Sequence, residues 1–64
     1  MKTSLAVWRA KRGLTQEQLA DVVGVTRQTI ISLEAGRYNP SLQLAWSIMK
    51  AVGAKKIDEL FELK

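Results

Sequence analysis

The sequence LTQEQLADVVGVTRQTIISLE, residues 14–34, decides the fold because it reads as two short helices joined by a tight turn. Thr15 and Gln18 have the spacing of a capping box, in which each side chain hydrogen-bonds to the backbone of the other residue. The first helix is therefore expected over about 16–23, and Gly24 ends it because glycine adopts a positive φ without penalty. Its inward-facing residues are Leu19, Ala20 and Val23.

The second helix of this stretch is expected over about 27–35, with Thr26 as its N-cap and Val25 plugging the turn into the core. Ile30 and Leu33 are expected to face inward. The outward-facing positions are Arg27, Gln28, Thr29, Ile31 and Ser32. A turn of three residues that contains a glycine, placed between two short helices, has the length of a helix-turn-helix motif.

A helix before this motif is expected over about 3–12, with Gly13 as its stop. Its inward stripe consists of Leu5 and Trp8, together with Ala6 or Val7. Trp8 is predicted to be a core residue rather than a ligand contact, since apolar stripes on helices most often face a core.

Two further helices are expected after the motif. Pro40 marks a loop, and Ser41 then caps a helix over about 42–52. The apolar series of that helix is Leu42, Ala45, Ile48, Met49 and Val52. A short fifth helix is expected over about 56–61, with Ile57, Leu60 and Phe61 inward. The tail, residues 62–64, is left open between a frayed end and a short strand.

Composition limits the classes of function. The chain has 64 residues, which predicts one domain over residues 1–64. The helices expected above make it a compact all-α fold of five helices, with a short terminal strand pair left open. It has neither cysteine nor histidine, which excludes thiolate and imidazole metal sites and nucleophile–histidine catalysis. We therefore expect no enzymatic activity, no cofactor and no small-molecule ligand.

The location of the protein is also predicted from hydropathy. No apolar run approaches the ~20 residues that span a bilayer. The start, MKTSLAVWRAKRG, has only a four-residue apolar segment and no small-residue cleavage site, so it is predicted to be a helix rather than a signal peptide. These features predict a cytoplasmic protein without a membrane partner.

The charge balance favours a polyanionic partner without proving one. The formal net charge is +4. Residues 1–39 hold six basic and three acidic side chains, whereas residues 40–64 hold four basic and three acidic side chains. The half that contains the two-helix motif is therefore the more basic half.

Four segments together resemble a known family. They are G-L-T-Q-E-Q-L-A at 13–20, G-V-T-R-Q-T-I at 24–30, L-E-x-G at 33–36 and R-Y-N-P-S-L at 37–42. In combination they are similar to the phage Cro and CI repressor type of helix-turn-helix, the XRE family, and most of all to its very small stand-alone repressors. The resemblance covers about residues 5–61 and implies a five-helix, lambda-repressor-like domain that binds double-stranded operator DNA as a homodimer.

The resemblance also implies roles for individual residues. The family's base-reading positions match Arg27, Gln28, Thr29, Ile31 and Ser32. Its phosphate-anchoring glutamine matches Gln16, and its backbone-contacting loop matches Arg37, Tyr38 and Asn39. A family ion pair matches Arg9 and Glu34, to which we assign a structural role. Thr26 is a further phosphate candidate because free amides at a helix N-terminus favour a phosphate oxygen.

Several of these residues have a second interpretation. Arg27 is as well suited to a phosphate as to a guanine edge, and Thr26 serves as a helix cap in either case. Ile31 either contacts a thymine methyl group or is an ordinary exposed apolar residue. Tyr38 either packs over the fourth helix or donates to a phosphate, and Asn39 is also suited to an Asx turn before Pro40.

The sequence departs from the family pattern at two positions. Lys56 stands where a serine or threonine often caps the fifth helix, so that end is expected to be frayed or shifted. Trp46 stands where leucine is common, which makes the surface of the fourth helix bulkier. The candidate dimer contacts are Trp46, Leu60 and Leu63, because the last two helices hold more apolar residues than one small core needs.

Taken together, the sequence predicts a sequence-specific DNA-binding transcriptional regulator, a repressor that binds a palindromic operator through the major groove. The alternative is a protein-interaction module of the antitoxin or adaptor type with the same helix-turn-helix fold.

Overall fold

The structure is a computed structural model that describes residues 2–62. It contains four α-helices, one turn of 3₁₀ helix and two short strands in its described part. In chain order these elements are β1 (Lys2–Thr3), α1 (Leu5–Lys11), α2 (Gln16–Val23), α3 (Arg27–Glu34), α4 (Leu42–Val52), the 3₁₀ turn η1 (Ile57–Glu59) and β2 (Phe61–Glu62). The candidate dimer residue Leu63 lies outside the described residues.

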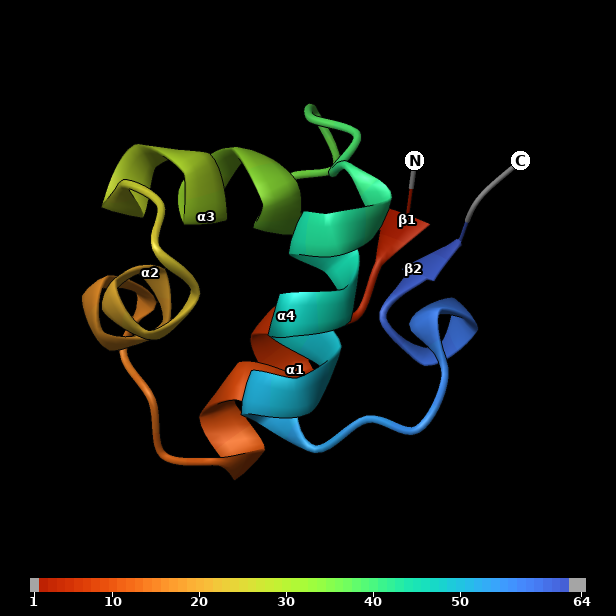
Figure 1. Ribbon diagram of the computed structural model, residues 1–64, viewed down its shortest axis with the longest axis horizontal. Helices are drawn as coiled ribbons and strands as arrows, with labels where there is room; N and C mark the ends of the chain where they lie inside the picture. Colours follow the sequence, from red (N-terminus) through yellow and green to blue (C-terminus); the bar gives the residue numbers. More distant parts are fainter. Residues whose placement is uncertain (1, 63–64) are drawn as a thin grey trace.

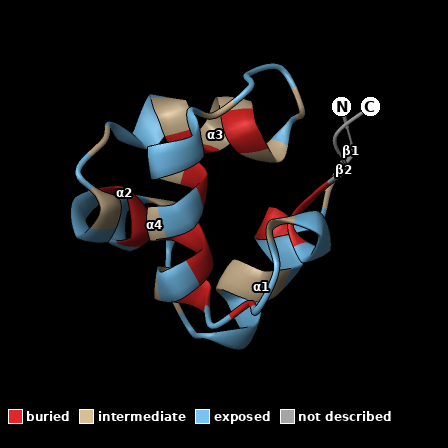
Figure 2. Ribbon diagram, turned by 45° about the vertical axis from the view of Figure 1, so that its right-hand side comes forward, coloured by how far each residue is buried: buried red, intermediate tan, exposed pale blue. Residues whose placement is uncertain are grey.

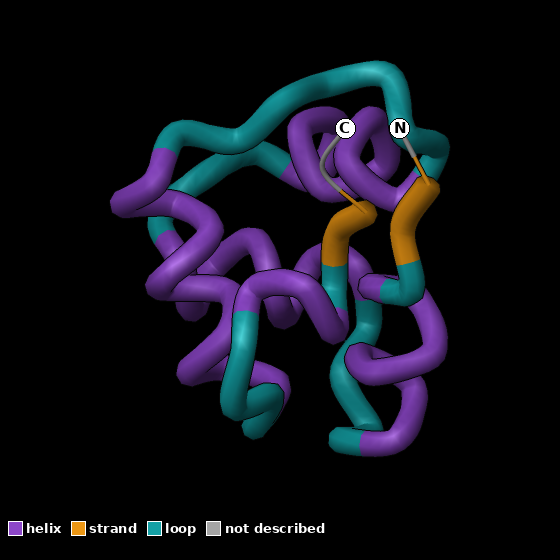
Figure 3. Tube along the Cα trace, turned by 90° about the vertical axis from the view of Figure 1, so that its right-hand side faces the viewer, coloured by secondary structure: helices purple, strands orange, loops and turns teal. Residues whose placement is uncertain are grey.

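The helices surround α4, which runs through the middle of the molecule (Figure 1). Helix α3 crosses one end of the molecule, α2 lies below it, and the turn that joins α1 to α2 lies at the opposite end. The two ends of the described chain meet as antiparallel strands, with Thr3 opposite Phe61 and Lys2 opposite Glu62 (Figure 3). This arrangement leaves one long side of α3 uncovered.

The core is entirely apolar. Its buried residues, which line the inner side of α4 and the helices facing it (Figure 2), are Leu5, Leu19, Ala20, Ile30, Leu33, Ala45, Ile48, Met49, Val52, Ala54, Leu60 and Phe61. No polar or charged side chain among the described residues is buried with them. Trp8, Val23 and Val25 are half-buried and pack against this core, so the predicted inward stripes of the motif are confirmed.

Three helices begin at the predicted caps. The Gln18 amide donates to Thr15 Oγ1 at 3.0 Å, while the Thr15 amide donates to Gln18 Oε1 at 2.8 Å, which completes the capping box. The hydroxyls of Thr26 and Ser41 accept from backbone amides at 3.2 and 3.1 Å in the same way. Gly24 ends α2 with φ of 77°, a value that glycine adopts without steric penalty. The motif is therefore fixed locally at both ends of its turn.

The start of the chain differs from the prediction. The helix expected over 3–12 begins only at Leu5, because Thr3 belongs to β1 and its Oγ1 accepts from the Leu5 amide at 3.1 Å. Ala6 and Val7, the alternative inward residues, are both exposed.

The expected fifth helix over 56–61 is also wrong, since only the single turn η1 forms. The Glu59 carboxylate accepts from the Lys55 and Lys56 amides at 2.9 Å and stabilises this one turn. The Leu60 carbonyl then accepts from the Ser4 amide at 2.8 Å, so pairing with the start of the chain takes the place of a helical hydrogen bond.

One predicted core position of α4 is wrong as well. Leu42, assigned to the inward series, is 76% exposed. It is the first residue of α4, where it borders a shallow hollow with Pro40 and Ile57 instead of packing against another helix.

Within the described residues, no helix is both long and apolar enough to span a bilayer.

Candidate nucleic-acid interface

The uncovered side of α3 carries the predicted base-reading residues. Arg27 and Gln28 are exposed in the first turn, while Thr29, Ile31 and Ser32 are half-buried. The Thr26 and Thr29 hydroxyl oxygens lie 3.0 Å apart and form a polar pair at the start of the helix. Arg27 and Gln28 are therefore the most accessible of the five side chains. Thr29, Ile31 and Ser32 are partly covered.

The residues expected at the DNA backbone come from the start of α2 and from the loop that follows α3. Arg37, Tyr38 and Asn39 follow α3 directly and are exposed, Tyr38 to 45%. The Arg37 amide donates to the Ser32 carbonyl at 3.0 Å, which fixes the start of their loop against α3. Gln16 is the first residue of α2 and is half-buried. The fold thus brings together residues from α2, α3 and the loop after α3.

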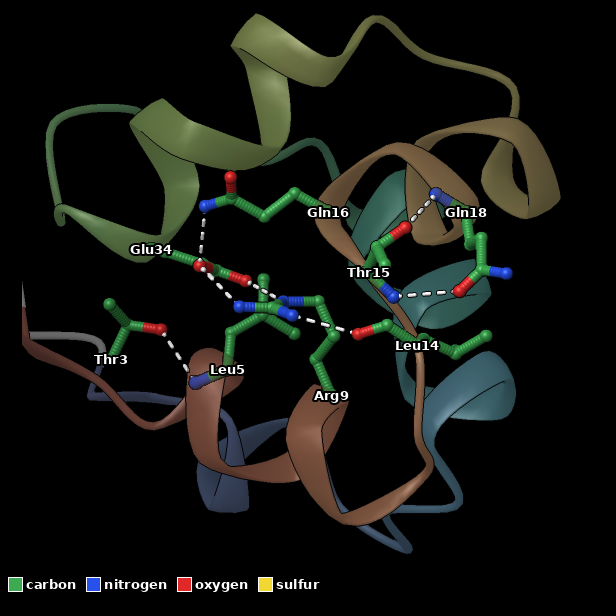
Figure 4. A network of polar contacts seen from close by, with 8 residues as sticks. All are labelled: Thr3, Leu5, Arg9, Leu14, Thr15, Gln16, Gln18 and Glu34. Carbon is green, nitrogen blue, oxygen red and sulfur yellow. Dashed lines mark hydrogen bonds and ion pairs between the residues drawn. The ribbon is translucent and has the colours of Figure 1, made fainter.

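The predicted ion pair between Arg9 and Glu34 is present and connects three parts of the chain (Figure 4). Arg9 Nε lies 2.6 Å from Glu34 Oε2, and Arg9 Nη2 donates to Glu34 Oε1 at 3.3 Å. Arg9 Nη1 also donates to the Leu14 carbonyl at 2.8 Å. The two charged side chains are only 18% and 9% exposed. Helix α1, the connection before α2 and the end of α3 are therefore held in one arrangement.

Gln16 belongs to the same network, which the sequence did not predict. Its Nε2 donates to Glu34 Oε1 at 3.0 Å (Figure 4). Gln16 and Glu34 lie on different helices, so no helical or strand periodicity in the sequence connects them. The two residues had been assigned separate roles, one at the DNA backbone and one in the fold, although their side chains touch.

The cations are distributed over more than the α3 side. Of the described basic side chains, Arg27 and Arg37 lie on this candidate interface, and the charge of Arg9 is paired with Glu34. Lys11 is the last residue of α1 and Arg12 follows it, where the chain enters the turn at the end of the molecule opposite α3 (Figure 1). Lys55 lies in the connection between α4 and η1, and this connection begins at the same opposite end (Figure 1). The positive charge of the candidate interface is therefore modest.

The predicted dimer contacts fare differently from one another. Trp46 is 51% exposed on α4, with Lys50 Nζ 5.4 Å from the centroid of its ring. Leu60 is only 1% exposed and packs into the core, so its assignment to a dimer surface is wrong. The reason is that η1 and β2 fold back over the core. The apolar residues of this segment, Leu60 and Phe61, are buried there and are not left over for a dimer surface.

Comparison with known proteins identifies the family. A family model described as helix-turn-helix matches residues 5–60. The chain belongs to this family, and the predicted resemblance to its XRE-type members is confirmed.

Proteins named as HTH-type transcriptional regulators are similar over nearly the whole chain. One from Methanothermobacter thermautotrophicus is 56% identical over 63 residues, which cover 98% of this chain and 91% of that protein. One from Archaeoglobus fulgidus is 52% identical, covering 95% of this chain and 86% of that protein. YgzD of Bacillus subtilis is 45% identical, covering 100% and 96%.

Solved structures share the fold. The restriction-modification controller protein C.AhdI from Aeromonas hydrophila superposes with a TM-score of 0.77 at 33% identity, covering 89% of this chain and 85% of that one. The clp gene regulator ClgR from Corynebacterium glutamicum gives a TM-score of 0.79 at 34% identity, covering 86% and 70%.

Proposed function

We propose that this protein is a sequence-specific, DNA-binding transcriptional regulator that places α3 in the major groove. The observation that carries the proposal is the exposed first turn of α3, with Arg27 and Gln28 outward on a helix whose position is fixed by the Arg9–Glu34 pair. Arginine and glutamine are suited to bidentate contacts with guanine and adenine in that groove. The relatives named as transcriptional regulators support the same function.

The residues around this helix then divide into two groups. Gln28, Thr29, Ile31 and Ser32 face the bases, while Gln16, Thr26, Arg37, Tyr38 and Asn39 hold the phosphates on either side. Arg27 contacts either a base or a phosphate. Regulation is proposed to be repression, in which the bound protein occupies promoter DNA.

Selection of bound sequences from a random DNA pool tests the function and supplies the operator. With that operator, Gln28→Ala is expected to narrow the difference in binding free energy between operator and scrambled DNA by about 1–3 kcal/mol for each half-site, the worth of one bidentate base contact. Competition binding with the two duplexes measures the gap.

Gln43→Ala is the matched control for this experiment, because Gln43 is an exposed glutamine on α4. It should leave the gap unchanged. Equal loss of affinity for both duplexes in Gln28→Ala would show that Gln28 is not a base reader. If the unaltered protein shows no salt-dependent DNA binding, the antitoxin or adaptor alternative replaces the proposal.

The protein is further proposed to act as a homodimer on a palindromic operator. One small domain offers few base contacts, and two copies related by a two-fold axis would read half-sites about 34 Å apart. Trp46 is proposed as the centre of the dimer contact. It is 51% exposed, and Leu42, one turn earlier on the same helix, is 76% exposed.

Trp46→Ser is expected to shift the protein toward monomer without unfolding it, because half of the indole is already in solvent. Sedimentation at micromolar concentration measures the association state, and circular dichroism shows whether the helices remain. Val22→Ser is a matched control, since Val22 is 64% exposed on α2. An unaltered protein that is already a monomer at this concentration contradicts the proposed DNA-free dimer.

A further inference from the structure

The hydrogen bond between Gln16 and Glu34 links the fold to the candidate DNA site. We propose that Glu34 is a positioning residue for DNA binding, which holds the Gln16 amide in place before the duplex arrives. This inference rests on the proposed contact between Gln16 and a phosphate. It changes the role of the Arg9–Glu34 pair from a clamp between helices to a part of the interface.

The chemistry of the two groups fixes the orientation of the amide. A carboxylate only accepts hydrogen bonds, so the atom of Gln16 that faces Glu34 at 3.0 Å is the nitrogen. A glutamine amide nitrogen carries two hydrogens. One is used by Glu34 Oε1, and the other remains for a phosphate oxygen. An unrestrained glutamine would present either end of its amide, and its oxygen would repel a phosphate.

The negative charge of Glu34 is compensated by Arg9, beside the proposed phosphate contact. A bare carboxylate beside the DNA backbone would repel the phosphates, but Arg9 binds both oxygens of Glu34, at 2.6 and 3.3 Å. The Glu34 side chain is 9% exposed, and Gln16 is half-buried at the start of α2. The carboxylate is therefore covered and neutralised, and in this proposal the amide that it holds is directed toward the phosphate.

The position of Gln16 on its helix favours the same ligand. It is the first residue of α2, where the backbone amides of the first turn lack acceptors within the helix and attract anions, apart from the Gln18 amide, which donates to Thr15 Oγ1. The side-chain amide and these backbone amides therefore serve one anion together. Because Glu34 has already restricted the glutamine rotamers, DNA binding does not have to order that side chain.

A double-mutant cycle separates positioning from simple stabilisation. Its four proteins are the unaltered chain, Gln16→Ala, the pair Arg9→Met with Glu34→Met, and the combination of all three changes. Both members of the ion pair are replaced because removing one would leave an unpaired, largely buried charge. Binding is measured with the selected operator and with a scrambled duplex, and the folded fraction is measured by circular dichroism at the same temperature.

We expect Gln16→Ala and the Arg9→Met/Glu34→Met pair each to weaken binding to both duplexes about tenfold for every protomer in the complex, the worth of one hydrogen bond to a charged group. The combined variant should bind no more weakly than Gln16→Ala alone, because Glu34 then has no amide to hold. Independent losses that multiply to about a hundredfold for every protomer would overturn the positioning role while leaving the Gln16 contact intact. If Gln16→Ala binds as the unaltered protein does, the phosphate contact is wrong and the inference falls with it.

Two further variants control for folding. Arg9→Lys keeps a cation beside Glu34 but loses the planar, bidentate geometry, so the melting temperature should fall while DNA affinity stays within about twofold. Glu34→Asp keeps the charge but withdraws the carboxylate by one methylene group, and it replaces the Met pair in the cycle if that pair does not fold. The DNA affinity of these variants could instead follow their melting temperature alone, both with Gln16 and with Gln16→Ala. That result would show that the network only stabilises the fold.

Discussion

Phe61→Ala is expected to destabilise the fold by about 3–5 kcal/mol, the range for truncating a fully buried phenylalanine. Phe61 is 0% exposed and is among the largest fully buried side chains. A domain of this size has little stability to spare, since small domains bury a low fraction of their surface and total stabilities are commonly about 5–15 kcal/mol. We therefore expect the variant to be largely unfolded at the melting temperature of the unaltered protein. It should remain partly unfolded well below that temperature.

Thermal and urea unfolding followed by circular dichroism measure this loss. Tyr38→Ala is the matched control, because it removes an aromatic ring that is 45% exposed in the loop after α3. It should change stability by no more than about 0.5 kcal/mol, as surface substitutions usually do. Equal melting temperatures for Phe61→Ala and the unaltered protein would show that β2 does not cover the core.

Phe61 also shows where prediction from the sequence succeeds and where it fails. Its apolar side chain was correctly assigned to the core, but its backbone was assigned to a helix. The hydrogen-bonding partner of its strand is the segment Lys2–Thr3, at the other end of the chain. Pairing across that separation leaves no local pattern, whereas the caps at Thr15 and Thr26 depend on residues three positions away and were predicted correctly.

The candidate site shows the same division between local and distant information. Helical periodicity was enough to place Arg27 and Gln28 on an exposed face. It could not reveal that Gln16 and Glu34 share a hydrogen bond, because that contact depends on how α2 and α3 pack. Leu60 was predicted both to face inward and to join a dimer surface, and only the inward position is confirmed, since counting apolar residues does not tell which of them the core buries.

The second large effect concerns salt. The structure leaves two described cations per protomer on the candidate interface, Arg27 and Arg37, because Arg9 is paired with Glu34. If both contact phosphates in a dimer, four phosphates are neutralised and the slope of log K against log salt is about −3.6. Raising salt from 50 to 200 mM should then weaken binding to a scrambled duplex by about 150-fold. If Arg27 reads a base instead, only Arg37 contributes and the slope is about −1.8.

Single substitutions, introduced into both copies of the proposed dimer, decide between these values of the slope. Arg37→Ala should flatten the slope by about 1.8, since each neutralised phosphate contributes about 0.9 and both protomers lose one. Arg27→Ala should flatten it equally if that side chain holds a phosphate, but should leave the slope unchanged and reduce discrimination against scrambled DNA if it reads a base. Lys55→Ala is the matched control, because Lys55 is exposed in the connection between α4 and η1, outside the candidate interface. A slope near −9 or steeper for the unaltered protein, or a flatter slope in Lys55→Ala, would contradict the interface, because it would require phosphate contacts from cations outside it.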